Sequence, residues 1–290
     1  MTEITARTKV LALLGHPVGH SVSPAMHNAA LAALGLDWCY LAFDVAPDRL
    51  AEALSGARAL GMKGLNLTIP HKEAALAQMT KVDPAARSIG AINTVCLEKE
   101  ALVGYNTDKE GFLRAIAGAR FSPAGKRAAL LGAGGVARAV LVALAEADLR
   151  ELSIADGVPE RAETLAALAA ELGLQSRALP WEEGRREMAG NSDLIVNATP
   201  LGMAPRTDET PLPGEWLRQG QFVCDLVFNP DPTRLMREAR ERGCPVLGGL
   251  DMLVHQGALS FQLWTGIEPP LPVMAAAARA ALEGSADEAE

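Results

Sequence analysis

The chain has little of what marks membrane, secreted or nucleic-acid-binding proteins. Its 290 residues contain no apolar run of membrane-spanning length, and the N-terminus lacks the basic, apolar and small residues of a signal peptide. Only four cysteines occur and none has C-x-x-C spacing, so we expect buried, reduced thiols rather than a disulfide framework or a zinc site. The net charge of -8 and the lack of a basic block disfavour nucleic acid as a partner.

These absences favour a small metabolite as the partner. We expect a cytoplasmic protein that binds neither membranes nor nucleic acid and that is a monomer or a homodimer. His16, His20 and His27 lie close together, but they are not placed at i and i+4 of one helix with an acid between them. We therefore expect no metal site.

One glycine-rich stretch carries the clearest motif. The run Gly132-Ala133-Gly134-Gly135-Val136-Ala137 fits the G-x-G-x-x-A fingerprint of dinucleotide-binding domains, and it follows a short apolar run at Arg127–Leu131. Gly132 permits the tight turn, Gly134 lets backbone N–H groups approach a pyrophosphate, and Ala137 allows close packing of helix on strand. An ordinary glycine turn is the alternative, but the helical pattern at 136–147 and a second strand favour a βαβ unit.

That second strand, Leu152–Asp156, ends in a carboxylate. Asp156 lies 24 positions beyond Gly132, close to the spacing at which an acid accepts hydrogen bonds from the adenosine ribose hydroxyls. A 2′-phosphate at this place would be repelled, and Arg161 nearby would offset the repulsion only in part. The pattern thus favours NAD while leaving NADP as an accepted cofactor.

Alternating strand and helix patterns predict two α/β domains. The N-terminal part has strand patterns at Lys9–Leu14, Trp38–Val45 and Lys63–Ile69 with helical patterns between them, which favours a mainly parallel sheet. Ser122-Pro123-Ala124-Gly125 has the composition of a linker into the dinucleotide-binding domain. The acidic residues 284–290 are expected to form a disordered tail.

Polar side chains gather at the carboxyl end of the strand at 63–69. Asn66 and Thr68 share one face because side chains alternate along a strand, and Lys72 follows near the start of a helix. Ligands of open α/β sheets bind at this end. A lysine on a helix is usually a solvated charge, and Asp108 could be the N-cap of the next helix. The same carboxylate could also hold a lysine for proton transfer.

Ordered motifs span nearly the whole chain. They are His20-Ser21-Val22-Ser23-Pro24 with His27-Asn28, Asn66-Leu67-Thr68-Ile69-Pro70-His71-Lys72, Gly90-Ala91-Ile92-Asn93-Thr94, Gly104-Tyr105-Asn106-Thr107-Asp108, the glycine loop, Asn197-Ala198-Thr199-Pro200-Leu201-Gly202-Met203, and Met252-Leu253-Val254-His255-Gln256. Through them the sequence resembles the shikimate dehydrogenase family. The resemblance implies a substrate domain of residues 1–121 completed by helices within 248–283, and a Rossmann-type domain of residues 122–247.

The resemblance also implies roles for individual residues. Lys72 and Asp108 would be the catalytic pair, Lys72 transferring the proton and Asp108 orienting its ammonium group. Substrate contacts would come from both of these and from Ser21, Ser23, Asn66, Thr68, Asn93, Phe228 and Gln256. Cofactor contacts would come from Gly132, Ala133, Gly134, Gly135, Val136, Asp156, Arg161, Thr199, Leu226 and Gly249.

Two positions depart from the family pattern. Members that use NADP usually continue the second strand with Asn-Arg-Thr, whereas this chain has Asp156-Gly157-Val158 and so lacks the main cation for a 2′-phosphate. Phe228 stands where a tyrosine is expected, which removes a hydroxyl near the substrate. Both departures bear on the ligands rather than on the catalytic pair.

The expected function is shikimate dehydrogenase, with reversible hydride transfer between a nicotinamide cofactor and 3-dehydroshikimate or shikimate in aromatic amino-acid biosynthesis, the chorismate pathway. One alternative is an NAD-dependent quinate/shikimate dehydrogenase of quinate catabolism; the paired serines favour shikimate. A second alternative is a non-catalytic dinucleotide-binding sensor. Retention of both Lys72 and Asp108 argues against it.

Overall fold

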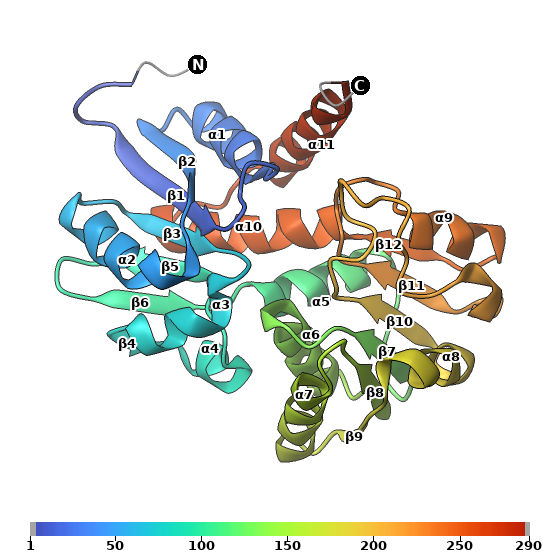
Figure 1. Ribbon diagram of the computed structural model, residues 1–290. Helices are drawn as coiled ribbons and strands as arrows, with labels where there is room; N and C mark the ends of the chain where they lie inside the picture. Colours follow the sequence, from blue (N-terminus) through green and yellow to red (C-terminus); the bar gives the residue numbers. More distant parts are fainter. Residues whose placement is uncertain (1–3, 288–290) are drawn as a thin grey trace. The chain divides into compact units, whose positions relative to one another are not determined.

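Two compact α/β units make up the protein. The computed structural model describes residues 4–287, and the chain divides into one unit running to Gly111 and resuming at Val254, and a second unit of Phe112–Leu253 (Figure 1). The chain passes from one unit to the other within two helices, α5 (Asp108–Gly118) and α10 (Gly249–Thr265). The changes expected from the sequence lie at 121/122 and 247/248, because a Pro/Gly-rich loop has the composition of a linker and a helix that continues from one unit into the next does not.

The first unit is built on a mixed six-stranded sheet of order β2-β1-β3-β5-β6-β4. Its strands are β1 (Lys9–Gly15), β2 (Trp38–Asp44), β3 (Gly64–Leu67), β4 (Lys81–Val82), β5 (Thr94–Leu97) and β6 (Leu102–Tyr105). β1 pairs in parallel with β2 and β3, and β4 in parallel with β6, so the expected mainly parallel sheet is confirmed. β5 is antiparallel to β3 and β6, and the short β5–β6 connection allows only a hairpin.

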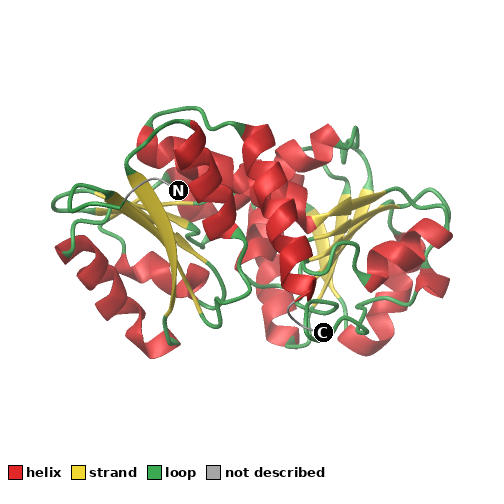
Figure 2. Ribbon diagram, turned by 90° about the horizontal axis from the view of Figure 1, so that it is seen from above, coloured by secondary structure: helices red, strands yellow, loops and turns green. Residues whose placement is uncertain are grey.

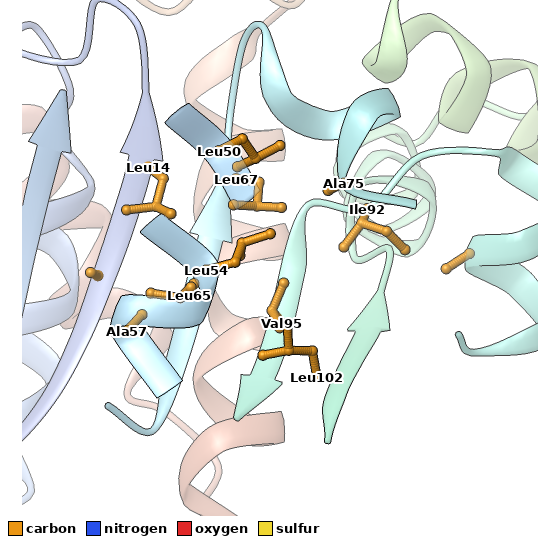
Figure 3. Packing of buried hydrophobic residues seen from close by; sticks show 12 residues of the cluster. Leu14, Leu50, Leu54, Ala57, Leu65, Leu67, Ala75, Ile92, Val95 and Leu102 are labelled. Atoms are coloured by element: carbon orange, nitrogen blue, oxygen red, sulfur yellow. The ribbon is translucent and has the colours of Figure 1, made fainter. Parts of the chain in front are cut away.

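Short helices connect these strands. They are α1 (Ser23–Ala33), η1 (Pro47–Arg49), α2 (Leu50–Ala59), α3 (His71–Ala74), η2 (Ala75–Gln78) and α4 (Pro84–Ile89), and the unit is completed by the end of α10 and by α11 (Leu271–Asp287). Leu50, Leu54 and Ala57 recur at helical spacing on α2 and pack onto the sheet (Figure 3). Leu65 and Leu67 of β3 join the same core. Because side chains alternate along a strand, Asn66 points to the opposite face.

The second unit has an all-parallel six-stranded sheet of order β12-β11-β10-β7-β8-β9, flanked by helices (Figure 2). The elements are β7 (Arg127–Leu131), α6 (Gly135–Glu146), β8 (Glu151–Ala155), α7 (Pro159–Glu171), β9 (Gln175–Ala178), α8 (Trp181–Asn191), β10 (Leu194–Asn197), η3 (Gly214–Trp216), β11 (Phe222–Asp225), α9 (Arg234–Glu241) and β12 (Val246–Gly248). This is the Rossmann order, with β7 at the topological switch point where dinucleotides bind. The expected fold class is confirmed.

The C-terminal segment differs from the prediction of a disordered tail at 284–290. α11 continues through Gly284 to Asp287, and residues 288–290 lie outside the described residues. The alanine-rich sequence that precedes Gly284 is a strong helix former and carries the helix past a glycine that disfavours it by about 1 kcal/mol. Of the helices within 4–287, none is long and apolar enough to span a membrane.

All four cysteines are free thiols. Cys224 and Cys244 are buried as expected, whereas Cys39 and Cys96 are only half-buried. Cys39 lies on β2, an edge strand whose side chains from Leu41 to Asp44 are exposed. The apolar sequence of this strand suggested more burial than its position at the edge of the sheet allows.

One histidine of the first unit is completely buried. His27 on α1 is fully buried and stacks on Tyr40 with ring centroids 4.3 Å apart. Within residues 4–287, neither of its ring nitrogens has a hydrogen-bond partner. Burial lowers the pKa of His27 from 6.5 to about 3, so the ring is neutral at physiological pH.

We expect the stability of the protein to depend on pH through His27. Between about pH 6.5 and 3 the unfolded chain protonates this residue and the folded chain does not, so the unfolding free energy falls by up to about 1.4 kcal/mol per pH unit as pH decreases. Urea unfolding of wild type and His27→Phe across this range isolates the effect, since all other titratable groups are shared. Two curves that stay parallel would show that His27 is not buried in the neutral form.

Candidate active site

The predicted catalytic pair is present in the first unit. Lys72 Nζ donates to Asp108 Oδ2 at 2.6 Å, and the two side chains are only 15% and 4% exposed. Lys72 lies on α3, directly after β3, and Asp108 is the first residue of α5. Lys72 is therefore not a solvated surface charge.

Asp108 does not act as the N-cap of α5, which was one reading of the sequence. Asn106 takes that place, because its Oδ1 accepts the backbone N–H groups of Asp108 at 3.0 Å and Lys109 at 3.4 Å. Because Asn106 caps the helix, both carboxylate oxygens of Asp108 remain available to accept hydrogen bonds from side chains.

Asn93 holds the second oxygen of Asp108. Its Nδ2 lies 2.9 Å from Asp108 Oδ1 and 3.2 Å from Gln256 Oε1. The backbone N–H of Thr107 donates to Asn93 Oδ1 at 2.8 Å, which fixes the orientation of the amide. Asp108 thus accepts from an ammonium on one side and from a neutral amide on the other, as an ionised carboxylate does.

Asn66 belongs to the same network. It is 6% exposed, its Oδ1 accepts from the hydroxyl of Tyr40 at 2.8 Å, and its Nδ2 lies 3.1 Å from Ser260 Oγ and 3.2 Å from Thr94 Oγ1. Sequence reasoning missed Tyr40, Thr94, Thr107 and Ser260. Thr94 and Thr107 are next to Asn93 and Asp108 in the sequence, and Ser260 lies one helical turn after Gln256. Their closeness to predicted site residues is the feature of the sequence that could have identified these three.

The other predicted substrate residues lie outside this network. Ser21 and Ser23 stand where the loop enters α1, and the backbone N–H of Ser23 donates to Ser21 Oγ at 3.2 Å. Thr68 follows β3 with its methyl group against Gly15, and in the described part of the chain its hydroxyl has no hydrogen-bond partner. Phe228 is half-buried after β11 in the second unit. Their roles toward a substrate stay predictions.

The glycine loop of the second unit has the geometry of a dinucleotide site. Gly132 adopts φ +100°, and a Cβ there would lie 2.8 Å from the carbonyl oxygen of Ala198. A Cβ on Gly134 would meet no atom within 4 Å. α6 begins at Gly135, and the first N–H groups of a helix have no intrahelical partner and attract phosphate. These residues fit a dinucleotide.

Asp156, directly after β8, is held by the backbone. Its Oδ2 accepts the N–H of Ala133 at 2.8 Å and its Oδ1 accepts the N–H of Val158 at 2.8 Å. The carboxylate therefore connects the glycine loop to the start of α7. Arg161 is exposed on the first turn of that helix.

A second buried carboxylate organises the ends of β10 and β11. Asp225 accepts from Asn197 Nδ2 at 2.8 Å and from Thr233 Oγ1 at 2.6 Å, and burial raises its pKa to about 6. Asn197 Oδ1 in turn accepts from the hydroxyl of Thr199 at 2.7 Å. A Cβ on Gly249 would collide with the carbonyl of Leu226, so this strand end requires a glycine.

Comparison with known proteins agrees with this geometry. A family model described as the shikimate dehydrogenase substrate binding domain matches residues 13–95, and one described as the shikimate 5′-dehydrogenase C-terminal domain matches residues 249–279. A curated shikimate dehydrogenase (NADP(+)) from Moorella thermoacetica is 52% identical over 98% of this chain and 97% of its own length.

Solved structures of shikimate 5-dehydrogenases are similar to this chain along nearly their whole length. Shikimate 5-dehydrogenase from Thermus thermophilus, in complex with NADP(H) and shikimate, has a TM-score of 0.85 and 43% identity, covering 95% of this chain and 100% of its own. The enzyme from Listeria monocytogenes, in complex with shikimate and NAD, has a TM-score of 0.85 and 36% identity, covering 94% and 98%.

The fold and the two groups of residues define a two-domain, nicotinamide-dependent oxidoreductase. The chain belongs to the shikimate dehydrogenase family. The expected family and enzyme class are thereby confirmed.

Two glycines of the loop are expected to respond differently to alanine. Gly132→Ala places a Cβ at a positive φ against a carbonyl and should destabilise the protein by about 1–3 kcal/mol, lowering Tm. Gly134→Ala should leave Tm unchanged but weaken NAD(P)H binding by about tenfold or more, because the Cβ occupies space through which phosphates approach. Thermal unfolding and fluorescence titration with NAD(P)H measure both. Equal Tm losses, or unchanged binding by Gly134→Ala, would contradict this assignment.

Proposed function

We propose that this protein catalyses the reversible oxidation of shikimate to 3-dehydroshikimate with a nicotinamide cofactor, in aromatic amino-acid biosynthesis. The observation that carries the proposal is the buried Lys72–Asp108 pair surrounded by neutral amides in the first unit. It is supported by the relatives named above, which are shikimate dehydrogenases.

The side chains around the pair suit a small polyhydroxylated acid. Asn66, Asn93 and Gln256 supply neutral hydrogen-bonding groups for ring hydroxyls, and Ser21 with Ser23 would hold the carboxylate. A site of this kind rejects an analogue that lacks one hydroxyl, because a buried polar group is then left unpaired. Quinate is the competing substrate, and turnover of both under the same conditions separates the two functions.

Proton transfer is the step that the protein itself performs. The bound nicotinamide would supply the hydride in the reducing direction and take it up in the oxidising direction. As the substrate carbonyl is reduced, its oxygen gains negative charge and Lys72 donates a proton to it. Asp108 keeps the ammonium aimed through the 2.6 Å contact, and Asn93 keeps Asp108 in place.

We further propose a preference for NAD over NADP. The curated relative is named for NADP(+), and of the two solved relatives described above one holds NADP(H) and the other NAD. Support for the NAD preference therefore comes from residues of this chain. The carboxylate of Asp156 is fixed by two backbone N–H groups and cannot turn away easily, and Gly157 offers no cation. A 2′-phosphate beside Asp156 is repelled by roughly 2–4 kcal/mol at an effective dielectric near 20 before screening, and Arg161 offsets part of this.

A cytoplasmic location is likewise proposed. It is supported by four free thiols, two of them half-buried, as expected in a reducing compartment. A monomer or a homodimer stays the prediction for the oligomeric state.

Removing the lysine should abolish turnover with little effect on binding. Lys72→Ala is expected to lower kcat by about 10²–10⁴ while the Kd for shikimate stays within about tenfold, since the loss is that of a proton-transfer group. Asp108→Asn should behave alike. Lys63→Ala, which removes a lysine at the other end of β3, is the matched control. A near-normal kcat for Lys72→Ala would remove the lysine from the mechanism.

Cofactor choice is tested at the end of β8. Wild type should show at least about tenfold higher kcat/KM with NAD than with NADP, and Asp156→Asn/Gly157→Arg should reverse or erase that ratio. Gly157→Arg alone is the control, because it adds the cation but keeps the carboxylate that holds Ala133. The proposal for Asp156 is wrong if the wild type has the higher kcat/KM with NADP, or if the ratio of kcat/KM with NAD to that with NADP is unchanged in the double variant.

A further inference from the structure

Asn66 is a polar residue on a buried strand, and its amide can adopt only one orientation. Nδ2 lies 3.1 Å from the backbone carbonyl oxygen of Asn93, which can only accept, so the nitrogen must face it. Oδ1 then faces the hydroxyl of Tyr40 at 2.8 Å, and the tyrosine must be the donor. The orientation of the amide is therefore set from both ends by neighbours.

Tyr40 is a rigidly held donor. Its side chain on β2 is fully buried, with its ring stacked on His27 and tilted against Trp264 at 6.1 Å. Asn28 brackets its backbone, accepting from Tyr40 N at 2.8 Å and donating to Tyr40 O at 2.8 Å. Burial raises the pKa of Tyr40 well above its usual range, so the hydroxyl keeps its proton. The tyrosine thus brings a hydrogen-bond donor to Asn66 with little freedom to rotate.

Ser260 holds the other end of the amide. It is fully buried on α10, and its Oγ lies 3.1 Å from Asn66 Nδ2, 2.7 Å from Thr94 Oγ1 and 3.1 Å from Thr107 Oγ1. The same oxygen lies 3.1 Å from the backbone carbonyl of Gln256. One hydroxyl therefore joins β3, β5, the residue before Asp108 and the helix turn that carries Gln256.

We propose that Tyr40 and Ser260 are positioning residues for substrate recognition, acting through Asn66. By donating to Oδ1 and accepting from Nδ2, they present Asn66 to a substrate hydroxyl in one fixed orientation, with one lone pair of Oδ1 left to accept from that hydroxyl. Neither residue needs to touch the substrate. The inference rests on the proposed function, because it assigns Asn66 to a ring hydroxyl of shikimate.

The test uses two hydroxyl deletions that preserve most of the packing. Tyr40→Phe and Ser260→Ala should each raise the KM and Kd for shikimate about three- to tenfold, the size of one neutral hydrogen bond, with kcat within about twofold and the KM for the cofactor unchanged. Tyr105→Phe is the matched control, because it alters the only other tyrosine, whose hydroxyl makes no hydrogen bond to any residue from 4 to 287. It should leave the KM for shikimate unchanged.

A mutant cycle separates positioning from general destabilisation. In an Asn66→Ala background, Tyr40→Phe and Ser260→Ala should no longer raise the KM, since the amide they orient is gone. Repetition of the full KM increase in that background would overturn the proposal, and so would an unchanged KM of Tyr40→Phe whether or not Tm falls. Should Tyr40→Phe not fold, Ser260→Ala is judged by the same criteria. If wild type fails to oxidise shikimate, the proposed function fails; if it is active and the variants bind normally, only this inference fails.

Discussion

The ion pair between Lys72 and Asp108 is almost fully removed from water, and burial of two charges is unfavourable unless every remaining polar atom has a partner. Lys72 donates to one carboxylate oxygen of Asp108 and Asn93 donates to the other. Asn106, and not Asp108, caps the N-terminus of α5. Asn93 and Asn106 are thus part of what keeps the carboxylate of Asp108 oriented toward Lys72. Replacing Asn93, whose amide contacts both Asp108 and Gln256, therefore affects the charge pair as well as the contact to Gln256.

The same solution occurs at the strand ends of the second unit. Asp225 is buried and accepts hydrogen bonds from Asn197, Thr233 and the backbone N–H of Val227, while Asp156 accepts from two backbone N–H groups. In both units apolar side chains of the strands form the core. The carboxyl ends of the strands carry polar residues whose hydrogen bonds are completed by neighbouring loops. Parallel strands bring those ends together, so residues distant in sequence share one network.

Much of this arrangement follows from sequence pattern. The glycine fingerprint, the apolar strands and the acid after β8 have fixed spacings, and the structure has the Rossmann order that they predict. The chain changes from one unit to the other within continuous helices, which have no linker composition in the sequence. Tyr40 and Ser260 were missed because an isolated tyrosine or serine has no characteristic spacing, and only the tertiary fold brings their hydroxyls to Asn66. Asp108 was one candidate for the N-cap of α5, and Asn106 takes that place; both residue types are good N-caps, so the sequence alone does not separate them.

The central claim is that the amine of Lys72 transfers the proton, and chemical rescue tests it most directly. Small primary alkylamines added to Lys72→Ala should restore shikimate oxidation in a saturable manner, with a rate that varies with the pKa of the amine, since the amine takes over the missing group. Lys63→Ala should show no response to the amines. A folded Lys72→Ala protein that binds shikimate and cofactor yet shows no dependence on any amine would contradict the account.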